Sequence, residues 1–224
     1  RQVEMRNAEE RAVYATLSRA DLWRDAFRIV EKQVGRFPDG LNIEADFEYD
    51  GPELAKAAGK GAQGRIRFNL KRLALHRRQM DENERKRIEL EKSGRTLVYR
   101  VPPIRIERVI HHELVHVRQQ GYAAPDWFNE GLAVLVGDDP NPLYAFVHAG
   151  KEVGLLDLLP NEGLDGYARG HLFWKWLSHQ GWAERTVHLT VGARNDWQTA
   201  LQEVSGFSWS ELVFLEREWS ASEA

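Results

Sequence analysis

The sequence contains no cysteine among its 224 residues. A disulfide framework is therefore excluded, and any bound metal ion must be held by histidine, aspartate or glutamate side chains. The lack of cysteine, together with a chain that starts at Arg1 rather than at methionine, favours an exported or periplasmic bacterial protein.

Long hydrophobic runs are also absent. No segment has the roughly 20 consecutive apolar residues that a membrane-spanning helix needs, and no signal-peptide pattern is present. The formal net charge of -3 gives no overall attraction to nucleic acid or to an anionic membrane. The chain does have 42% hydrophobic residues, which is enough for a substantial core.

The hydrophobic pattern changes along the chain from mixed to helical. Apolar residues at helical spacing predict one helix over residues 8–34. Alternating apolar and polar residues predict strands at residues 41–49, 65–70 and 95–101. Helices are expected between these strands, a short one at residues 51–59 and a long charged one at residues 71–93. Nearly everything from Ile104 onward reads as helix.

This order of elements indicates the α+β class. We expect a small twisted mixed β-sheet packed on one helix, followed by a mainly helical C-terminal half. Residues 1–38 would form an N-terminal helical segment that packs on a domain spanning residues 39–224. Within that domain, the sheet part covers residues 39–120 and the helical part covers residues 121–224.

The segment IERVIHHELVHVRQQ, residues 106–120, carries histidines on a helix that otherwise looks buried. On a helical wheel His112 and His116 lie about 40° apart and one turn from each other, so both imidazoles can reach one ion. Glu113 lies beside them, whereas His111 points away in the opposite sense. The other side of the helix carries an apolar stripe: Ile106, Ile110, Leu114 and Val117.

His112, Glu113 and His116 form the H-E-x-x-H pattern of zinc metallopeptidases. Neutral imidazoles suit Zn²⁺, and the ion lowers the pKa of its bound water toward about 7. In this chemistry the glutamate does not bind the ion; it accepts a proton from the water and passes it to the leaving amine. The pattern predicts one zinc ion, with Glu113 as the general base.

A catalytic zinc keeps three protein ligands and one open position, so a further ligand is needed. The segment APDWFNEGLAVLV, residues 124–136, predicts a second helix with Asp126 as its N-cap. Glu130 lies one turn inside this helix among apolar residues, where a carboxylate without a partner is unfavourable. A metal ion would remove that penalty, and the short loop before the helix would let Glu130 fold back to the histidines.

HHELVHV followed by PDWFNEGLA resembles the peptidase-MA-like gluzincins, a thermolysin-related group of zinc metallopeptidases. The resemblance implies a zincin-like fold and hydrolysis of peptide bonds in a peptide or protein substrate. It also implies a zinc ion held by His112, His116 and Glu130, with Glu113 as the general base. Two later segments, GYARGHLFWKWL and residues 200–219, resemble the family more loosely.

Residues that would support the metal and the reaction follow from the same resemblance. The closest thermolysin relatives place an aspartate four residues beyond the ligand glutamate, where this chain has Val134. Asp126 or Asn129 is therefore expected to orient the ligands. On a later helix the family places a tyrosine as the donor to the oxyanion formed during hydrolysis; this would be Tyr167, with His171 as the alternative by geometry.

Related enzymes bind an extended peptide against an edge strand beside the zinc. The first candidate for this strand comprises Arg65, Ile66, Arg67, Phe68 and Asn69. Residues 95–101 are the second candidate. An ordinary sheet edge protected by arginines is the competing interpretation.

Two other functions stay open. One is a non-catalytic zinc-binding or scaffold protein that keeps the peptidase fold. The other is a protease that acts on nucleic-acid-bound proteins through the basic stretch 65–78, which holds six lysines and arginines and no acid. The acid-rich stretch that follows it and the negative net charge argue against nucleic acid as a partner.

Overall fold

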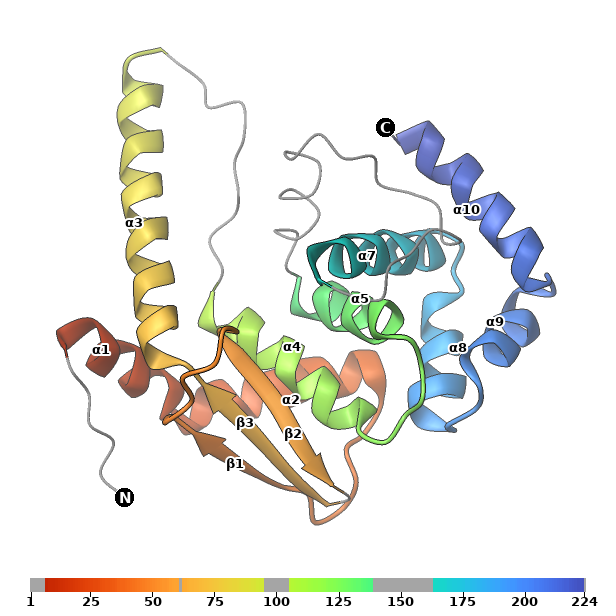
Figure 1. The fold of residues 1–224 in the computed structure, drawn as a ribbon, viewed down its shortest axis with the longest axis horizontal. Helices are drawn as coiled ribbons and strands as arrows, with labels where there is room; N and C mark the ends of the chain where they lie inside the picture. Colours follow the sequence, from red (N-terminus) through yellow and green to blue (C-terminus); the bar gives the residue numbers. More distant parts are fainter. Residues whose placement is uncertain (1–6, 61, 95–104, 139–162, 224) are drawn as a thin grey trace.

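The computed structural model describes residues 7–60, 62–94, 105–138 and 163–223. Figure 1 shows a small sheet beside helices α2 and α4, with the later helices gathered on the other side of α4. The described strands are confined to the first half of the chain, and the later elements are helices. The α+β class and the small sheet expected from the sequence are therefore confirmed.

Two helices, α1 (Ala8–Leu17) and α2 (Ala20–Val34), replace the single helix expected over residues 8–34. The chain turns between them, and the Trp23 indole N–H donates to the Leu17 carbonyl at 2.7 Å. Apolar spacing alone does not reveal this break. Val13 and Leu17 of α1 and Val30 and Val34 of α2 are all buried, as they would be on a single continuous helix.

The sheet has the order β1-β3-β2. Strand β1 (Asn42–Asp46) runs parallel and β2 (Ala55–Lys60) antiparallel to the central strand β3 (Gln63–Phe68). The prediction of a short helix at residues 51–59 is wrong, because β2 occupies most of that segment. Its alanines favour a helix locally, but pairing along β3 overrides this weak preference. The third predicted strand, residues 95–101, lies outside the described residues.

The long charged helix predicted at residues 71–93 is confirmed as α3 (Leu70–Lys92). The Asn69 side chain caps it by accepting from the Arg72 backbone N–H at 2.9 Å. Its first turns are buried through residues such as Leu73. Figure 1 shows the rest of the helix projecting away from the sheet.

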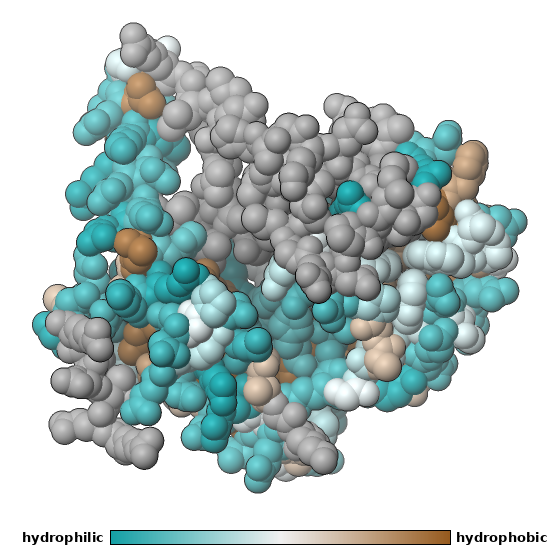
Figure 2. Space-filling view, viewed as in Figure 1, coloured by the Kyte–Doolittle hydropathy of each residue, from teal (hydrophilic) through white to brown (hydrophobic). Residues whose placement is uncertain are grey.

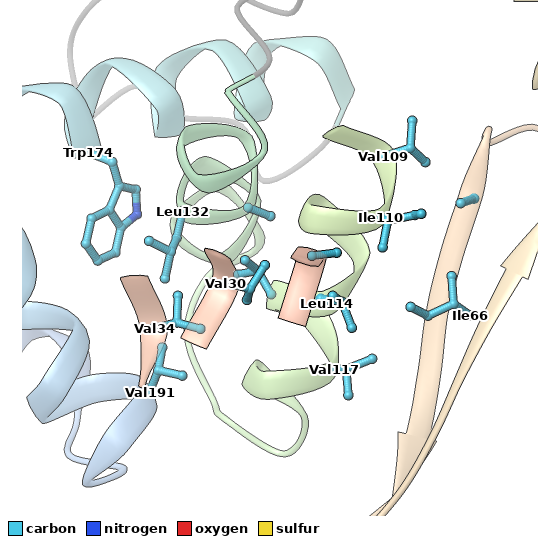
Figure 3. Packing of buried hydrophobic residues seen from close by; sticks show 14 of the residues in the cluster. Val30, Val34, Ile66, Val109, Ile110, Leu114, Val117, Leu132, Trp174 and Val191 are labelled. Carbon is cyan, nitrogen blue, oxygen red and sulfur yellow. The ribbon is translucent and has the colours of Figure 1, made fainter. Parts of the chain in front are cut away.

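Helix α4 (Ile106–Gln119) carries the motif histidines and lies between the sheet and the helical half. Its apolar stripe is largely buried, as expected. Figure 3 shows Ile110, Leu114 and Val117 on the side of α4 that faces Ile66 of the sheet. This packing fixes which face of α4 remains for the histidines.

Helices α5 (Asp126–Gly137) and α7 (Gly163–His179) approach each other closely where Gly131 faces Gly170. A Cβ added at Gly131 would lie 2.2 Å from the Gly170 carbonyl carbon. A Cβ added at Gly170 would lie 1.9 Å from the Trp127 carbonyl oxygen. Side chains at these two positions are therefore incompatible with the observed distance between the helices.

The C-terminal half continues with α8 (Ala183–Val187), the π-helix η2 (His188–Gly192), α9 (Trp197–Ser205) and α10 (Trp209–Glu223). Aromatic rings from this half surround Trp127 of α5 and hold that helix in place. The rings of Phe173, Trp197 and Trp209 have centroids 5.3, 5.6 and 6.5 Å from that of Trp127. None of the helices in the described part of the chain has the length and apolar character needed to cross a bilayer.

Replacing Gly170 with alanine should destabilise the protein by at least about 2 kcal/mol, because the new Cβ meets backbone that cannot move away alone. The matched control is Gly192→Ala in η2, where the nearest atom to an added Cβ is 3.7 Å away. The control should unfold at nearly the same denaturant concentration as the wild type. Equal stability of the two variants in chemical denaturation would contradict the close approach of α5 and α7.

Candidate metal centre

Three side chains from α4 and α5 bring one potential ligand atom each to a common point. The Nε2 atoms of His112 and His116 lie 3.0 Å apart. The Oε2 atom of Glu130 lies 3.3 Å from the first nitrogen and 3.2 Å from the second. Ligand atoms at about 2.0–2.1 Å from a tetrahedral zinc lie roughly 3.3 Å from one another. The three atoms therefore have the spacing of ligands to a single divalent ion.

A short turn between α4 and α5 brings Glu130 back to the histidines. The turn contains Gly121 at φ 72°, a left-handed conformation that favours glycine. The Tyr122 backbone N–H donates to the Gln119 carbonyl at 2.8 Å and closes the turn. The N-cap of α5 is Pro125, so the predicted cap at Asp126 is one residue too late.

The amide of Gln119 fixes the position of the proton on His116. The Gln119 Nε2 donates to the Asn129 backbone carbonyl at 3.1 Å, and a carbonyl can only accept. The Gln119 Oε1 therefore faces His116 Nδ1 at 3.0 Å, and that nitrogen must carry a proton. When the imidazole is neutral, its Nε2 consequently directs a lone pair toward Glu130.

This convergence of lone pairs favours a positive charge at the centre of the cluster. Burial lowers the pKa of His116, but the hydrogen bond with Glu130 and its negative charge outweigh burial and raise that pKa to about 9. Burial also opposes ionisation of Glu130, yet hydrogen bonds from His112 and His116 lower its pKa overall. A proton on His116 thus compensates the carboxylate, and a divalent cation at the same point would replace that proton and satisfy all three atoms.

Glu113 lies on α4 beside the cluster and is only 6% exposed. Burial raises its pKa above the usual range, an effect that the nearby His112 and His116 and a hydrogen bond from the Ala57 backbone only partly offset. A carboxylate with a raised pKa is a better proton acceptor than an exposed one. The sheet contributes to the site through this contact, because Ala57 belongs to β2.

Tyr167 of α7 stacks on the ring of His112. Its ring centroid lies 6.2 Å from that of His112, with an angle of 7° between the planes. Burial raises the pKa of the phenol, and the charge of Glu130 and a hydrogen bond with it raise the pKa further. The hydroxyl therefore stays protonated and lies beside the cluster as a hydrogen-bond donor.

His171, the other predicted oxyanion donor, lies one turn further along α7. Burial and the nearby Lys175 lower its pKa to about 4, so the ring is neutral. Its Nδ1 has no hydrogen-bond partner among the described residues, and the ring is not part of the ligand group. Of the two predicted donors, the structure brings Tyr167 and not His171 to the cluster.

The residues expected to orient the ligands have different roles. Asp126 is exposed at the start of α5 and makes no hydrogen bond to a ligand within the described chain. Asn129 acts through its backbone carbonyl, while its side-chain amide donates to the Ala124 carbonyl at 3.2 Å. Gln119, which the sequence did not single out, is the residue that holds His116. Its spacing of three residues from His116 on one helix is the signal that could have identified it.

The strand expected to bind substrate is not a sheet edge. Strand β3 pairs with β1 on one side and with β2 on the other. Within this strand Ile66 and Phe68 are buried in the core, and Arg65 and Arg67 form ion pairs with β1. Asn69, which follows the strand, caps α3. The prediction of an exposed edge at residues 65–69 is therefore wrong. Among the described strands, β2 is the one that contacts the motif helix at Glu113, and residues 95–101 lie outside the described part.

Comparisons of the chain with protein-family models, with curated proteins and with solved structures find no match. The resemblance to the gluzincins therefore rests on the motif residues themselves.

Replacing Gln119 with alanine should weaken zinc binding by about 10- to 100-fold, the usual effect of losing a partner that orients a ligand histidine. The matched control is Gln120→Ala, because neither amide atom of Gln120 has a partner in the described structure. The control should bind zinc as the wild type does in a competition titration with a chromophoric chelator. Equal affinities for all three proteins would show that Gln119 does not orient His116.

Proposed function

We propose that this protein is a zinc-dependent metallopeptidase that hydrolyses peptide bonds in a peptide or protein substrate. The observation that carries the proposal is the meeting of His112, His116 and Glu130 within 3.3 Å of one another, with Glu113 beside them. Two neutral imidazoles and one carboxylate form a ligand set of catalytic zinc sites, which keep one further position for solvent.

Each protein group has a distinct role in this reaction. A bound zinc ion would supply Lewis acidity, lowering the pKa of water and polarising the scissile carbonyl. Glu113 accepts the proton of the attacking water and returns it to the leaving amine. Tyr167 donates its hydroxyl proton in a hydrogen bond to the carbonyl oxygen as that oxygen becomes negative.

The site also supports the finer assignment to the gluzincins and to a zincin-like fold. Its ligands come from an H-E-x-x-H helix and from the helix that follows it, in the order that the family uses. A small mixed sheet packs on the first of these helices through Ile66. We place an extended substrate along β2, because the Ala57 backbone of that strand contacts Glu113.

The main competing function is a zinc-binding or scaffold protein without catalysis. The site geometry alone fits this function too, since metal binding requires only the three ligands. A role on nucleic-acid-bound proteins has less support, because Arg65 and Arg67 of the basic stretch already pair with Glu44 and Asp46.

The variants Glu113→Gln and His116→Ala separate these functions. Glu113→Gln should bind about one zinc per chain but lose peptide hydrolysis by at least about 100-fold, because the general base is gone. His116→Ala should lose zinc itself. The measurements are metal content by atomic emission and cleavage of casein or a peptide library, with chelator treatment and zinc readdition as controls. A wild type that binds zinc and cleaves no peptide would contradict the peptidase function and favour the scaffold function.

The role of Tyr167 has its own test. Tyr167→Phe removes only the hydroxyl and should lower kcat by about 100-fold or more, as loss of an oxyanion donor does, with zinc affinity little changed. His171→Ala, on the same helix but outside the cluster, should keep kcat within a few-fold of the wild type. Steady-state kinetics on one peptide decide between them, and the reverse order of effects would assign the oxyanion donor to His171.

A further inference from the structure

Arg194, a residue distant in sequence from the motif, holds the end of the helix that carries it. Its guanidinium donates to the Arg118 carbonyl at 3.1 Å and to the Gln119 carbonyl at 3.3 Å. These carbonyls belong to the last turn of α4, where backbone acceptors have no partner within the helix. The planar fork of arginine is suited to binding two neighbouring oxygens at once.

The backbone at Arg194 is held in an unusual conformation. Its φ is 62°, in the left-handed region that residues other than glycine rarely adopt. The residue follows the π-helix η2, and its backbone N–H donates to the Thr190 carbonyl at 2.9 Å. Such strain persists only where the surrounding structure enforces it. Here it directs an arginine side chain toward α4.

Arg194 and Asn195 also contact the turn between α4 and α5. The Tyr122 hydroxyl donates to the Asn195 carbonyl at 2.9 Å. The Arg194 guanidinium carbon lies 6.0 Å from the centre of the Tyr122 ring. The segment after η2 is therefore attached both to the last turn of α4 and to the turn that brings Glu130 back.

We propose that Arg194 is a positioning residue for the metal ligand His116 and acts through Gln119. The Gln119 carbonyl is bound by Arg194, and its side-chain amide bridges His116 Nδ1 and the Asn129 carbonyl. Fixing the backbone of Gln119 keeps its Oε1 on His116, so that the Nε2 lone pair of His116 stays directed at the cluster. This inference rests on the proposed metal site and adds a remote residue to it.

A double-mutant cycle tests whether Arg194 acts on His116 through Gln119. Arg194→Asn removes the fork but keeps a residue that tolerates the left-handed backbone. It should weaken zinc binding by about 10-fold. In the Gln119→Ala background the same change should have almost no further effect, because the path it acts through is already broken. The control is Arg185→Asn, an exposed arginine whose ion pair with Glu203 lies on α8 and α9.

A second readout uses the metal-free protein. Long-range ¹H–¹⁵N correlation spectra recorded at alkaline pH, where the His116 imidazole is neutral, should assign its proton to Nδ1 in the wild type and to a mixture of both nitrogens in Arg194→Asn. A role limited to stabilising the end of the helix would lower Tm without moving this signal. If Arg194→Asn folds poorly, Arg194→Gly relieves the backbone strain and removes the same fork.

The outcomes are distinct. Zinc affinity of Arg194→Asn within twofold of the wild type, or losses that simply add in the double variant, would overturn the role of Arg194. Failure of the wild type to bind zinc would instead overturn the proposed function. The His116 proton position in the metal-free protein would in that case still decide whether Arg194 acts through Gln119.

Discussion

The structure of the site depends on the burial of one carboxylate, that of Glu130, against two imidazoles. Helix α5 is apolar around this residue, so an unpaired charge there would be strongly unfavourable. The nitrogen atoms of His112 and His116, 3.3 and 3.2 Å away, provide the compensation. His116 does so only with a positive charge between it and the carboxylate, because Gln119 holds the Nδ1 proton of His116 and leaves a lone pair on Nε2. The packing of α4 and α5 therefore brings together three side-chain atoms that could hold a metal ion.

Large parts of the molecule serve to hold α4 and α5 in their positions relative to one another. On one side, the sheet packs on the apolar stripe of α4 and places the Ala57 backbone at Glu113. On the other side, the contact of Gly131 with Gly170 brings α7 close enough for Tyr167 to stack on His112. The two glycines thus determine the position of Tyr167, because a wider spacing of α5 and α7 would move its phenol away from His112.

The sequence predicted those features that depend on local order. The H-E-x-x-H spacing places two histidines on one face of any helix, and a charged residue inside an apolar helix needs a partner wherever that helix lies. The long charged helix α3 and the strands β1 and β3 were also predictable from their periodicity. The segment 51–59 was not, because its alanines favour a helix and only the pairing of β2 with β3 makes it a strand.

Contacts between distant segments account for what the sequence could not reveal. The position of β3 in the middle of the sheet results from a parallel pairing with β1, and no pattern within residues 65–69 distinguishes a central strand from an edge strand. Gln119 could have been identified from the sequence, since it stands three residues after His116. Its role becomes clear only in the structure, where the Asn129 carbonyl fixes the orientation of its amide. Arg194 carries no local signal at all, because it approaches α4 from a segment 75 residues further along the chain.

The two halves of the chain accordingly make different contributions to one centre. The N-terminal half supplies the sheet backbone and the two histidines, whereas the later helices supply Glu130, Tyr167 and the contacts that hold Gln119. Both halves contact α4. The sheet packs along the apolar face of this helix, and Arg194 binds its last turn. Neither half can form the cluster alone, and the geometry of the cluster is therefore a property of tertiary packing. Metal binding to such a site should be coupled to the stability of the whole domain, because an unfolded chain does not bring the three ligands together.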